Sequence, residues 1–306
     1  MMAVTNIIKG QIRRVKNWRR HLFNLSLQTF IRLKIICECL RDGDLCKRNI
    51  GKYLFKLQKL TFLPYDWTKE YKKTDIKVFR EDDYPYVYHK GKKLYFPKEW
   101  TVSQCSKYYL SIIQEQDTRS PHKYLNEARR RPGKDDIVAD IGAAEGNFSL
   151  EVVDDIKKIY IFESDEKWIA PLLKTFSRYG EKVEIVKKYI GNKVGKTSTT
   201  IDDFFEHKEI TFIKADIEGA ELSMLRGGAI VLKHKIHKVL LCTYHKPNDE
   251  IILRYEMENY GFECSFNDGY VLYMYDRETF KPPYVRKCLM YCEKSPKSMI
   301  CHSRVN

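Results

Sequence analysis

The chain has 306 residues, of which 43% are hydrophobic and 13% aromatic, and it carries 55 Lys and Arg against 41 Asp and Glu. This composition excludes an intrinsically disordered chain, and the length suits one large domain with an extension or two modest domains. Charges interrupt every apolar run before it reaches the length of a transmembrane helix or forms the core of a signal peptide. The nine cysteines have no framework spacing, which predicts reduced thiols and a cytoplasmic protein.

Positive charge is concentrated at the start of the chain. Residues 1–60 carry fourteen Lys and Arg against three acids, whereas the other 246 residues have a net charge of only +3. Apolar residues at helical steps, with Lys and Arg beside them, predict a basic amphipathic helix on Ile8, Ile12, Val15 and Leu22. Such a helix can lie on an anionic membrane surface, dock on a protein partner or pack on the rest of the chain. We expect a basic helical extension over residues 1–63, a later helix near residues 30–40, and no nucleic-acid binding.

Residues 64–125 are expected to form a small cap that is rich in tyrosine. Alternating segments on both sides of Lys90–Lys92 predict a hairpin with a tight basic turn. A helix over residues 107–114 then leads into a polar loop that contains Asp117 and His122. Loops that hold Asp, Arg, His and Tyr so close together often carry function, although a solvated connection explains the composition equally well.

The segment at residues 136–150 predicts a ligand site. It contains a short apolar strand, an acidic strand end and two glycines that bracket a turn before a helix. Ala144 stands where a dinucleotide site would have its central glycine, and an acidic strand end would repel a pyrophosphate. A carboxylate there suits a cationic ligand better, such as the amino acid end of S-adenosylmethionine. The residues expected to bind this cofactor are Asp140, Gly142, Ala143, Gly146 and Asn147.

Two positions beyond this loop extend the predicted ligand site. The strand at residues 158–162 ends at Glu163, about 20 residues past the glycine loop, where a Rossmann-like domain places the carboxylate that holds ribose hydroxyls. Tyr189 follows a third strand at residues 182–186, where an adenine edge would lie. Two acidic strand ends beside one glycine loop therefore predict an adenosine-type ligand.

The second half of the chain continues the alternation of strands and helices. Further strands are expected at residues 210–214, 238–242, 262–266 and 270–275, the last two as a hairpin. Asp216 and His245 follow two of these strands at their carboxyl ends, where open α/β sheets bind ligands. The sequence therefore predicts an α/β fold of the Rossmann-like class I methyltransferase type. We expect a mostly parallel seven-stranded sheet with a terminal antiparallel hairpin over residues 126–280, and a tail at residues 281–306.

Several of these segments together resemble the FkbM-type methyltransferase family. The resemblance covers roughly residues 136–276, and its most distinctive part is the Lys-x-Asp-x-Glu-Gly-x-Glu signature from Lys214 to Glu221. The other matching segments are Asp140–Gly146, Phe162–Glu163, Thr200–Phe204, Tyr244–Asp249 and, as in a bacterial branch of the family, Gln116–His122. The resemblance implies transfer of a methyl group from S-adenosylmethionine to a hydroxyl oxygen of a sugar, a glycan or another secondary metabolite. The basic extension is not part of it.

The acceptor hydroxyl is a poor nucleophile, so a base or a metal beside it would assist the transfer. The candidate catalytic residues are His245, Asp216, Asp117 and His122. Asp216 either orients the acceptor hydroxyl or binds the cationic end of the cofactor. We expect no metal, because Glu221, which could complete a site with Asp216 and Glu218, is expected to face away along its helix.

Two other functions compete with methyl transfer. One is a nucleotide-dependent oxidoreductase, against which the missing Gly-x-Gly-x-x-Gly pattern counts. The other is a non-catalytic protein that keeps the Rossmann-like fold and binds a membrane or a partner through its basic helix. Calorimetric titration with S-adenosylmethionine, S-adenosylhomocysteine and NAD would separate all three.

Overall fold

The computed structural model describes residues 28–57, 60–127, 130–273 and 282–294. The chain divides into two compact units, residues 1–66 and residues 67–306. The expected extension, residues 1–63, thus ends within a few residues of the end of the first unit. The expected cap does not stand apart, because from Trp67 onward it belongs to the same unit as the main sheet.

The first unit contains two helices in its described part. Residues 28–41 are helical, which confirms the expected later helix, and α2 follows at Leu45–Leu57. The side chain of Asp44 accepts hydrogen bonds from the backbone N–H groups of Cys46 and Lys47, as an N-cap does. A Cβ on Gly51 of α2 would lie only 3.0 Å from the Cβ of Cys39, so the small residue lets the two helices pack closely. The amphipathic helix predicted on Ile8 to Leu22 lies outside the described residues.

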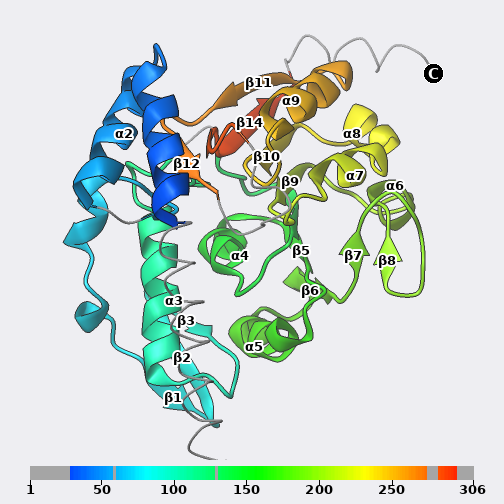
Figure 1. Cartoon of the computed structure of the whole chain (residues 1–306). Coiled ribbons are helices and arrows are strands. Elements are labelled where there is room, and N and C mark those ends of the chain that lie inside the picture. Colours follow the sequence, from blue (N-terminus) through cyan, green and yellow to red (C-terminus); the bar gives the residue numbers. More distant parts are fainter. Residues whose placement is uncertain (1–27, 58–59, 128–129, 274–281, 295–306) are drawn as a thin grey trace, which may run out of the picture. The chain divides into compact units, whose positions relative to one another are not determined.

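A seven-stranded sheet organises the second unit (Figure 1). Its strands are β4 (Ile137–Ile141), β5 (Lys158–Phe162), β6 (Val183–Val186), β9 (Phe212–Ala215), β10 (Lys238–Cys242), β11 (Glu263–Phe266) and β14 (Leu289–Glu293). They lie in the order β11-β14-β10-β9-β4-β5-β6. Neighbours from β10 to β6 pair in parallel, and only β14 runs antiparallel to both of its neighbours. One reversed strand in a mostly parallel sheet is the predicted class I methyltransferase fold, which is thereby confirmed.

The partner predicted for the antiparallel strand is wrong. β11 does not pair with the segment that follows it but with β14, where Cys264 lies opposite Cys292. β11 ends at Phe266, and the side-chain amide of the next residue, Asn267, donates to the carbonyls of Pro121 and Lys123. The next segment forms β12 (Val271–Leu272), which pairs with β13 (Val285–Arg286) in a separate small sheet.

This pairing also corrects the expected tail at residues 281–306. β14 lies within it, between β11 and β10, and its residues Leu289, Met290, Tyr291 and Cys292 are buried. β14 pairs with β10 on one side and with β11 on the other, as is typical of a strand with a continuous apolar run.

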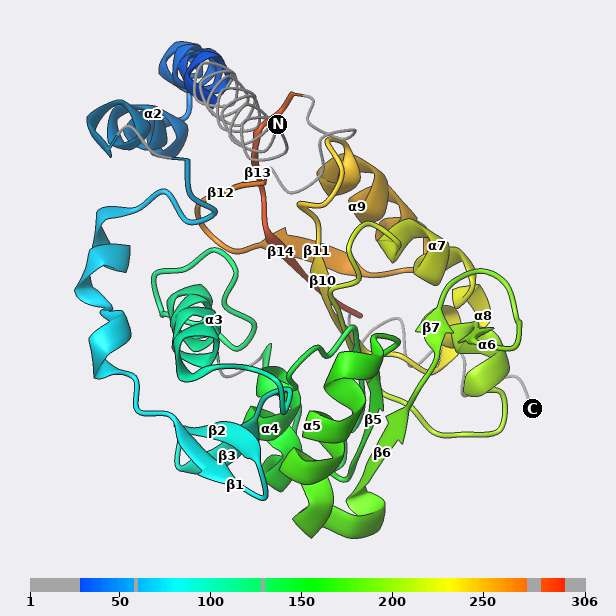
Figure 2. The same ribbon diagram turned by 60° about the horizontal axis from the view of Figure 1, so that its bottom comes forward.

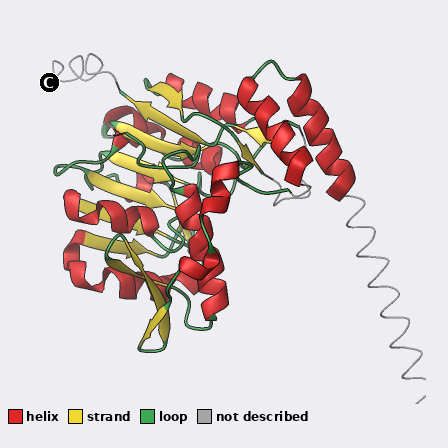
Figure 3. Cartoon of the chain, turned by 90° about the vertical axis from the view of Figure 1, so that its left-hand side faces the viewer, coloured by secondary structure: helices red, strands yellow, loops and turns green. Residues whose placement is uncertain are grey.

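Helices cover both faces of this sheet (Figures 2 and 3). They are α4 (Asn147–Val152), α5 (Glu166–Phe176), α6 (Ile201–Phe204), α7 (Glu221–Arg226), α8 (Ala229–His234) and α9 (Asp249–Asn259). Side chains of α6 to α9, such as Met224, Leu232 and Leu253, form one buried core with inward residues of the sheet. Short elements connect the helices and strands: η4 (Val153–Asp155), η5 (Ser177–Lys182), β7 (Tyr189–Ile190) and β8 (Ser198–Thr199).

The cap region contains a three-stranded antiparallel sheet and one long helix. Its elements are η1 (Asp66–Glu70), η2 (Lys73–Asp75), β1 (Phe79–Glu81), β2 (Tyr84–His89), β3 (Lys92–Tyr95) and α3 (Val102–Glu115). The β2–β3 pair is the predicted hairpin, and Thr101 begins α3 with a capping box. The hairpin packs on the main domain, where Lys92 donates to the carbonyl of Leu150 and Glu151 pairs with His89. Among the residues placed by the structure, no helix combines the length and apolar character needed to cross a bilayer.

Candidate functional site

The glycine loop between β4 and α4 crosses closely over the end of β9. Gly142 has φ +76° and Gly146 has φ +84°, conformations that favour glycine. A Cβ on Gly142 would lie 2.0 Å from the backbone oxygen of Asp216. The residue must therefore be glycine because of the neighbouring strand, not only because of a ligand. The loop thereby holds Asp216 directly beside the predicted cofactor site.

Asp140, at the end of β4, faces a buried lysine. Its Oδ1 lies 3.0 Å from Nζ of Lys214, and its Oδ2 accepts a hydrogen bond of 2.6 Å from the hydroxyl of Ser149. Lys214 also donates to the carbonyl of Gly142, 2.9 Å away. Burial lowers the pKa of Lys214, but the Asp140 carboxylate outweighs this effect, so the pKa is raised and the lysine stays charged. Lys214 therefore already neutralises the carboxylate that was expected to attract the cationic end of the cofactor.

Glu163, which follows the last residue of β5, holds the glycine loop through a hydrogen bond to its backbone. Its Oε2 accepts a hydrogen bond of 2.8 Å from the backbone N–H of Ala144, and its Oε1 accepts one of 2.7 Å from Asp165. A carboxylate has about four lone-pair positions, so two remain in addition to these bonds. The position suits the predicted contact with ribose hydroxyls, which stays a prediction.

The other predicted cofactor residues lie along the same edge of the sheet. Ala143 and Asn147 are buried in the loop and at the start of α4. Tyr189 begins β7 and is 42% exposed, so its ring is accessible. The proposed contact with adenine stays a prediction for Tyr189.

Two histidines converge on Asp216, the first residue after β9. Nε2 of His122 lies 3.5 Å from Asp216 Oδ2, and Nε2 of His245 lies 3.4 Å from Asp216 Oδ1. Tyr124 donates to Oδ2 at 2.9 Å and Tyr244 to Oδ1 at 3.2 Å. Burial raises the pKa of Asp216, but the hydrogen bond from His122 and the charge of His245 outweigh it and hold the pKa well below its usual range. Asp216 is therefore an ionised carboxylate in a protein-lined cluster.

His245 lies between two carboxylates. Its Nδ1 is 2.8 Å from Oε1 of Glu221, so the expectation that Glu221 faces away along α7 is wrong. The reason is that the turn before α7, with φ +54° at Glu218 and +94° at Gly219, brings Glu221 back against the end of β10. Burial lowers the pKa of His245, but Glu221 and then Asp216 outweigh it and raise the pKa to about 9. The ring is thus an imidazolium at neutral pH, which makes it a poor general base in this state.

Asp117 belongs to a different contact network. Its carboxylate accepts hydrogen bonds from Arg119 at 2.9 Å and from the hydroxyl of Tyr71, while Arg119 also pairs with Glu70. The arginine bonds outweigh the effect of burial and hold the pKa of Asp117 far below its usual range. Asp117 therefore anchors the loop that carries His122, through contacts with this loop and with the preceding segment.

Residues of α3 and the glycine loop add carboxylates that the sequence did not single out. Tyr108 donates to Oε2 of Glu145 at 2.8 Å, and burial raises the pKa of that carboxyl. Burial also raises the pKa of Glu115 to about 7, against the opposing charge of His122, whose Nδ1 is 3.8 Å away. Tyr124 and Tyr244 were also missed, although each adjoins or nearly adjoins a predicted histidine, because tyrosines in such segments are usually core residues.

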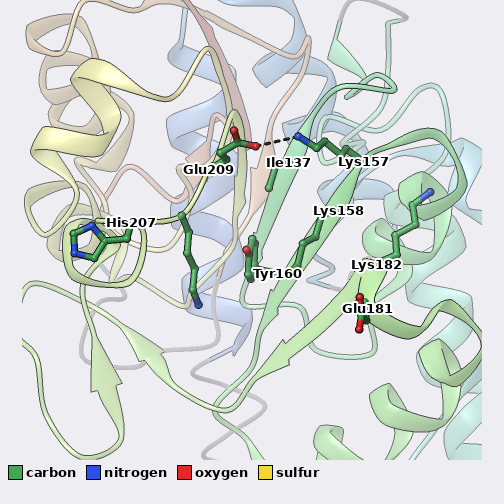
Figure 4. A pocket seen from close by; sticks show the side chains of 9 residues that line it. Ile137, Lys157, Lys158, Tyr160, Glu181, Lys182, His207 and Glu209 are labelled. Carbon is green, nitrogen blue, oxygen red and sulfur yellow. Dashed lines mark hydrogen bonds and ion pairs between the residues drawn. The ribbon is translucent and has the colours of Figure 1, made fainter.

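A shallow groove on the opposite edge of the sheet does not belong to this site (Figure 4). It is lined by Lys157, Lys158 and Lys182, at the amino ends of the strands. Figure 4 shows that Lys157 pairs with Glu209, at 3.0 Å. Ligands of open α/β sheets bind at the carboxyl ends, where the Asp216 cluster lies.

The chain is similar to several known proteins. Residues 121–264 match the methyltransferase FkbM domain. No curated protein matches the chain. Among solved structures, the methyltransferase FkbM from Methylobacillus flagellatus KT is similar, with 17% identity and a TM-score of 0.43, over 80% of this chain and 59% of that one. This chain thus spans about three fifths of that protein.

Two further similar structures contain S-adenosylhomocysteine. TrmK of M. capricolum shares 16% identity over 56% of this chain and 67% of its own, with a TM-score of 0.38. The methyltransferase SMU.1697c of Streptococcus mutans shares 13% identity over 53% of this chain and 90% of its own, with a TM-score of 0.36. The match of residues 121–264 to the methyltransferase FkbM domain confirms the family resemblance seen in the sequence.

Proposed function

We propose that the protein is an S-adenosylmethionine-dependent O-methyltransferase acting on a hydroxyl of a sugar, a glycan or another secondary metabolite. One observation carries the proposal most directly. The glycine loop and the end of β9 touch at Gly142 and Asp216, so the predicted cofactor site adjoins a cluster that contains His122 and His245. Cofactor and acceptor would therefore meet at one edge of the sheet, as an in-line transfer requires.

The residues present fit S-adenosylmethionine. Glu163 would hold the ribose hydroxyls, Tyr189 would lie along the adenine, and the loop from Ala143 to Asn147 would follow the amino acid end. The bound cofactor supplies the methyl group. Because Lys214 neutralises Asp140, that carboxylate would act by shaping the loop through Ser149 and Lys214.

We give the four catalytic candidates different tasks, based on their contacts. Asp216 would orient the acceptor hydroxyl, and His122, on the loop anchored by Asp117, would accept its proton. His245 is enclosed by Glu221 and Asp216, at 2.8 and 3.4 Å, so it would hold Asp216 in place rather than accept the proton. This assignment revises the role predicted for His245 while keeping it in the site.

Cofactor binding tests the proposal. Changing Glu163→Ala should weaken S-adenosylhomocysteine by about 1–3 kcal/mol, or roughly 5- to 150-fold, through lost hydrogen bonds to ribose. The matched control is Glu209→Ala, an exposed carboxylate at the opposite edge of the sheet. Isothermal titration with S-adenosylhomocysteine and NAD measures both variants. Wild-type affinity in a folded Glu163→Ala protein would remove the ribose assignment, and preference for NAD would favour the oxidoreductase.

The extension supports a second, separate role at a membrane. Phe30, Leu33 and Leu40 lie on one side of the helix at residues 28–41 and are 55%, 48% and 47% exposed. The preceding residues carry six Lys and Arg and no acid. We expect the protein to act in the cytoplasm and to co-sediment with anionic vesicles, with release by salt. If the protein did not sediment with the vesicles at low salt, the membrane role would be excluded. The basic extension would then dock on a protein partner or pack on the rest of the chain.

A further inference from the structure

The acidic turn between β9 and α7 and the end of β10 form a cluster with metal-binding chemistry. One oxygen each of Asp216 and Glu221 and one ring nitrogen of His245 lie within 4.8 Å of one another. A transition-metal ion binds such atoms at about 2.0–2.2 Å, so two ligands of one ion lie at most about 4.4 Å apart. Adjustments of a few tenths of an ångström would bring all three side chains onto one ion. We propose that Asp216, Glu221 and His245 bind a divalent transition-metal cation.

A second observation points to a missing partner at this cluster. Glu221 is 1% exposed, and while its Oε1 accepts a hydrogen bond from the N–H of Ile217, its Oε2 has no hydrogen-bond partner among the described residues. Leaving a buried charged oxygen without a partner is costly, and native structures rarely do so. Nε2 of His245 is buried in the same way and likewise lacks a hydrogen bond among these residues, with Asp216 Oδ1 3.4 Å away. A cation bound by this cluster would supply a partner that the described residues do not.

Neighbouring groups donate hydrogen bonds that hold the two proposed carboxylate ligands in orientation. Tyr124 and Tyr244 donate to the two oxygens of Asp216, and the backbone of Ile217 donates to Glu221, so each carboxylate is held in orientation. Such outer contacts fix ligand geometry in known metal sites. The exposed Glu218 lies at the edge of the cluster, with its Oε2 3.7 Å from His245 Nε2.

The ligand types decide which ion fits. Two carboxylates and one imidazole suit Mn²⁺, Fe²⁺ or Zn²⁺, whereas Mg²⁺ and Ca²⁺ prefer oxygen ligands alone. A second possible set, His122, Asp216 and Cys242, shares Asp216 but lacks the buried carboxylate oxygen of Glu221 that has no partner among the described residues. We therefore assign the ion to the set with Glu221. Three protein ligands leave open positions on the ion.

The consequence for catalysis rests on the proposed function. An acceptor hydroxyl bound at an open position of the ion would lose its proton more readily, because the cation stabilises the alkoxide. His122, whose Nε2 lies 3.5 Å from Asp216, would accept the proton on the ring nitrogen that carries none. Binding of the cation would displace the ring proton of His245, which would then serve as a ligand.

Mn²⁺ binding by the full chain tests the site without any assay of turnover. The protein is stripped with EDTA and titrated with MnCl₂, and free Mn²⁺ is followed by electron paramagnetic resonance. One ion should bind per chain, and electron spin echo modulation should show a directly bound ¹⁴N from the imidazole. Glu221→Gln should weaken binding at least about tenfold, as expected for loss of a coordinating carboxylate. The control is Glu151→Gln, which alters another buried His–Glu pair, with 3.2 Å between His89 and Glu151.

Several outcomes overturn the site. They are a wild-type protein that binds no Mn²⁺, bound Mn²⁺ without ¹⁴N modulation, or equal loss of affinity in Glu221→Gln and Glu151→Gln. The first two need only the wild type, so they hold even if a variant fails to fold. Titration with S-adenosylhomocysteine is run on the same samples. Cofactor binding without Mn²⁺ binding would refute the metal site alone, whereas absence of cofactor binding would refute the proposed function.

Discussion

Replacing Gly142 by alanine tests how the glycine loop and β9 fit together. Alanine at φ +76° costs about 1–2 kcal/mol in any surroundings, because its Cβ crowds the backbone. At this position the added carbon would also lie 2.0 Å from the backbone oxygen of Asp216 and 2.8 Å from Cγ2 of Ile217. Overpacking of this kind costs about 1–3 kcal/mol more as the neighbours shift. We expect Gly142→Ala to lower the free energy of unfolding by about 2–5 kcal/mol in total.

Gly261→Ala is the matched control. Gly261 has φ +86°, and a Cβ there meets no atom within 4 Å, so alanine experiences the backbone strain without the collision. In a thermal unfolding scan, each 1 kcal/mol lowers the melting temperature of a unit this large by about 2–4 °C. Gly142→Ala should therefore melt at least a few degrees below Gly261→Ala. It should also weaken S-adenosylhomocysteine, because relief of the collision displaces the backbone at Asp216. Equal melting temperatures for the two variants would refute the close crossing of loop and strand.

Two further predictions concern acid stability and proton transfer. Burial raises the pKa of Glu151, but the hydrogen bonds from His89 and Lys90 outweigh it and lower the pKa from 4.5 to about 2. Because the folded pKa lies below the unfolded one, this stabilisation, about 3 kcal/mol, is present above pH 4.5 and is lost as the pH falls through 2. Glu151→Gln should thus destabilise the protein at pH 7 in urea unfolding, with a gap to wild type that narrows below pH 4; a constant gap would contradict the assigned ion pairs. With an acceptor that supports turnover, His122→Gln should lower kcat by about 100-fold or more at unchanged affinity for S-adenosylhomocysteine, whereas the exposed His207→Gln should have no effect. Retained kcat in His122→Gln would exclude the proton-acceptor role.

The parallel part of the sheet could be predicted because each of its strands has a recognisable pattern in its own local sequence. Apolar runs such as 137–141 and 238–242 are buried on both faces, and each ends at a polar residue or a glycine turn. The antiparallel strand could not be predicted in the same way. An Asn-Asp-Gly turn at residues 267–269 has the local signature of a hairpin, but β11 pairs with β14 instead and Asn267 contacts the Pro121 loop. That loop lies far away in sequence, so no local pattern shows the contact.

The site shows the same division between local and distant information. The sequence placed Asp216 and His245 at neighbouring strand ends, and the parallel pairing of β9 with β10 brings them together. It could not show that Lys214 neutralises Asp140. The two residues lie on different strands, β9 and β4, and they meet only because the register of this strand pair places them opposite each other. Nor could helical periodicity show that Glu221 turns toward His245, since positive φ angles at two residues before α7 set its direction.

The resulting arrangement explains why the Lys-x-Asp-x-Glu-Gly-x-Glu segment is dense in charge at the end of a buried strand. Lys214 points to Asp140 and stabilises the glycine loop, while Asp216 and Glu221 both point to His245. Successive residues of a strand face opposite sides, so Lys214 and Asp216, which are two positions apart, face the same side, next to the loop. One short segment thus joins the predicted cofactor loop to the predicted catalytic cluster. A change at Glu221 should therefore affect the cluster while leaving the loop intact, whereas a change at Lys214 should affect the loop first.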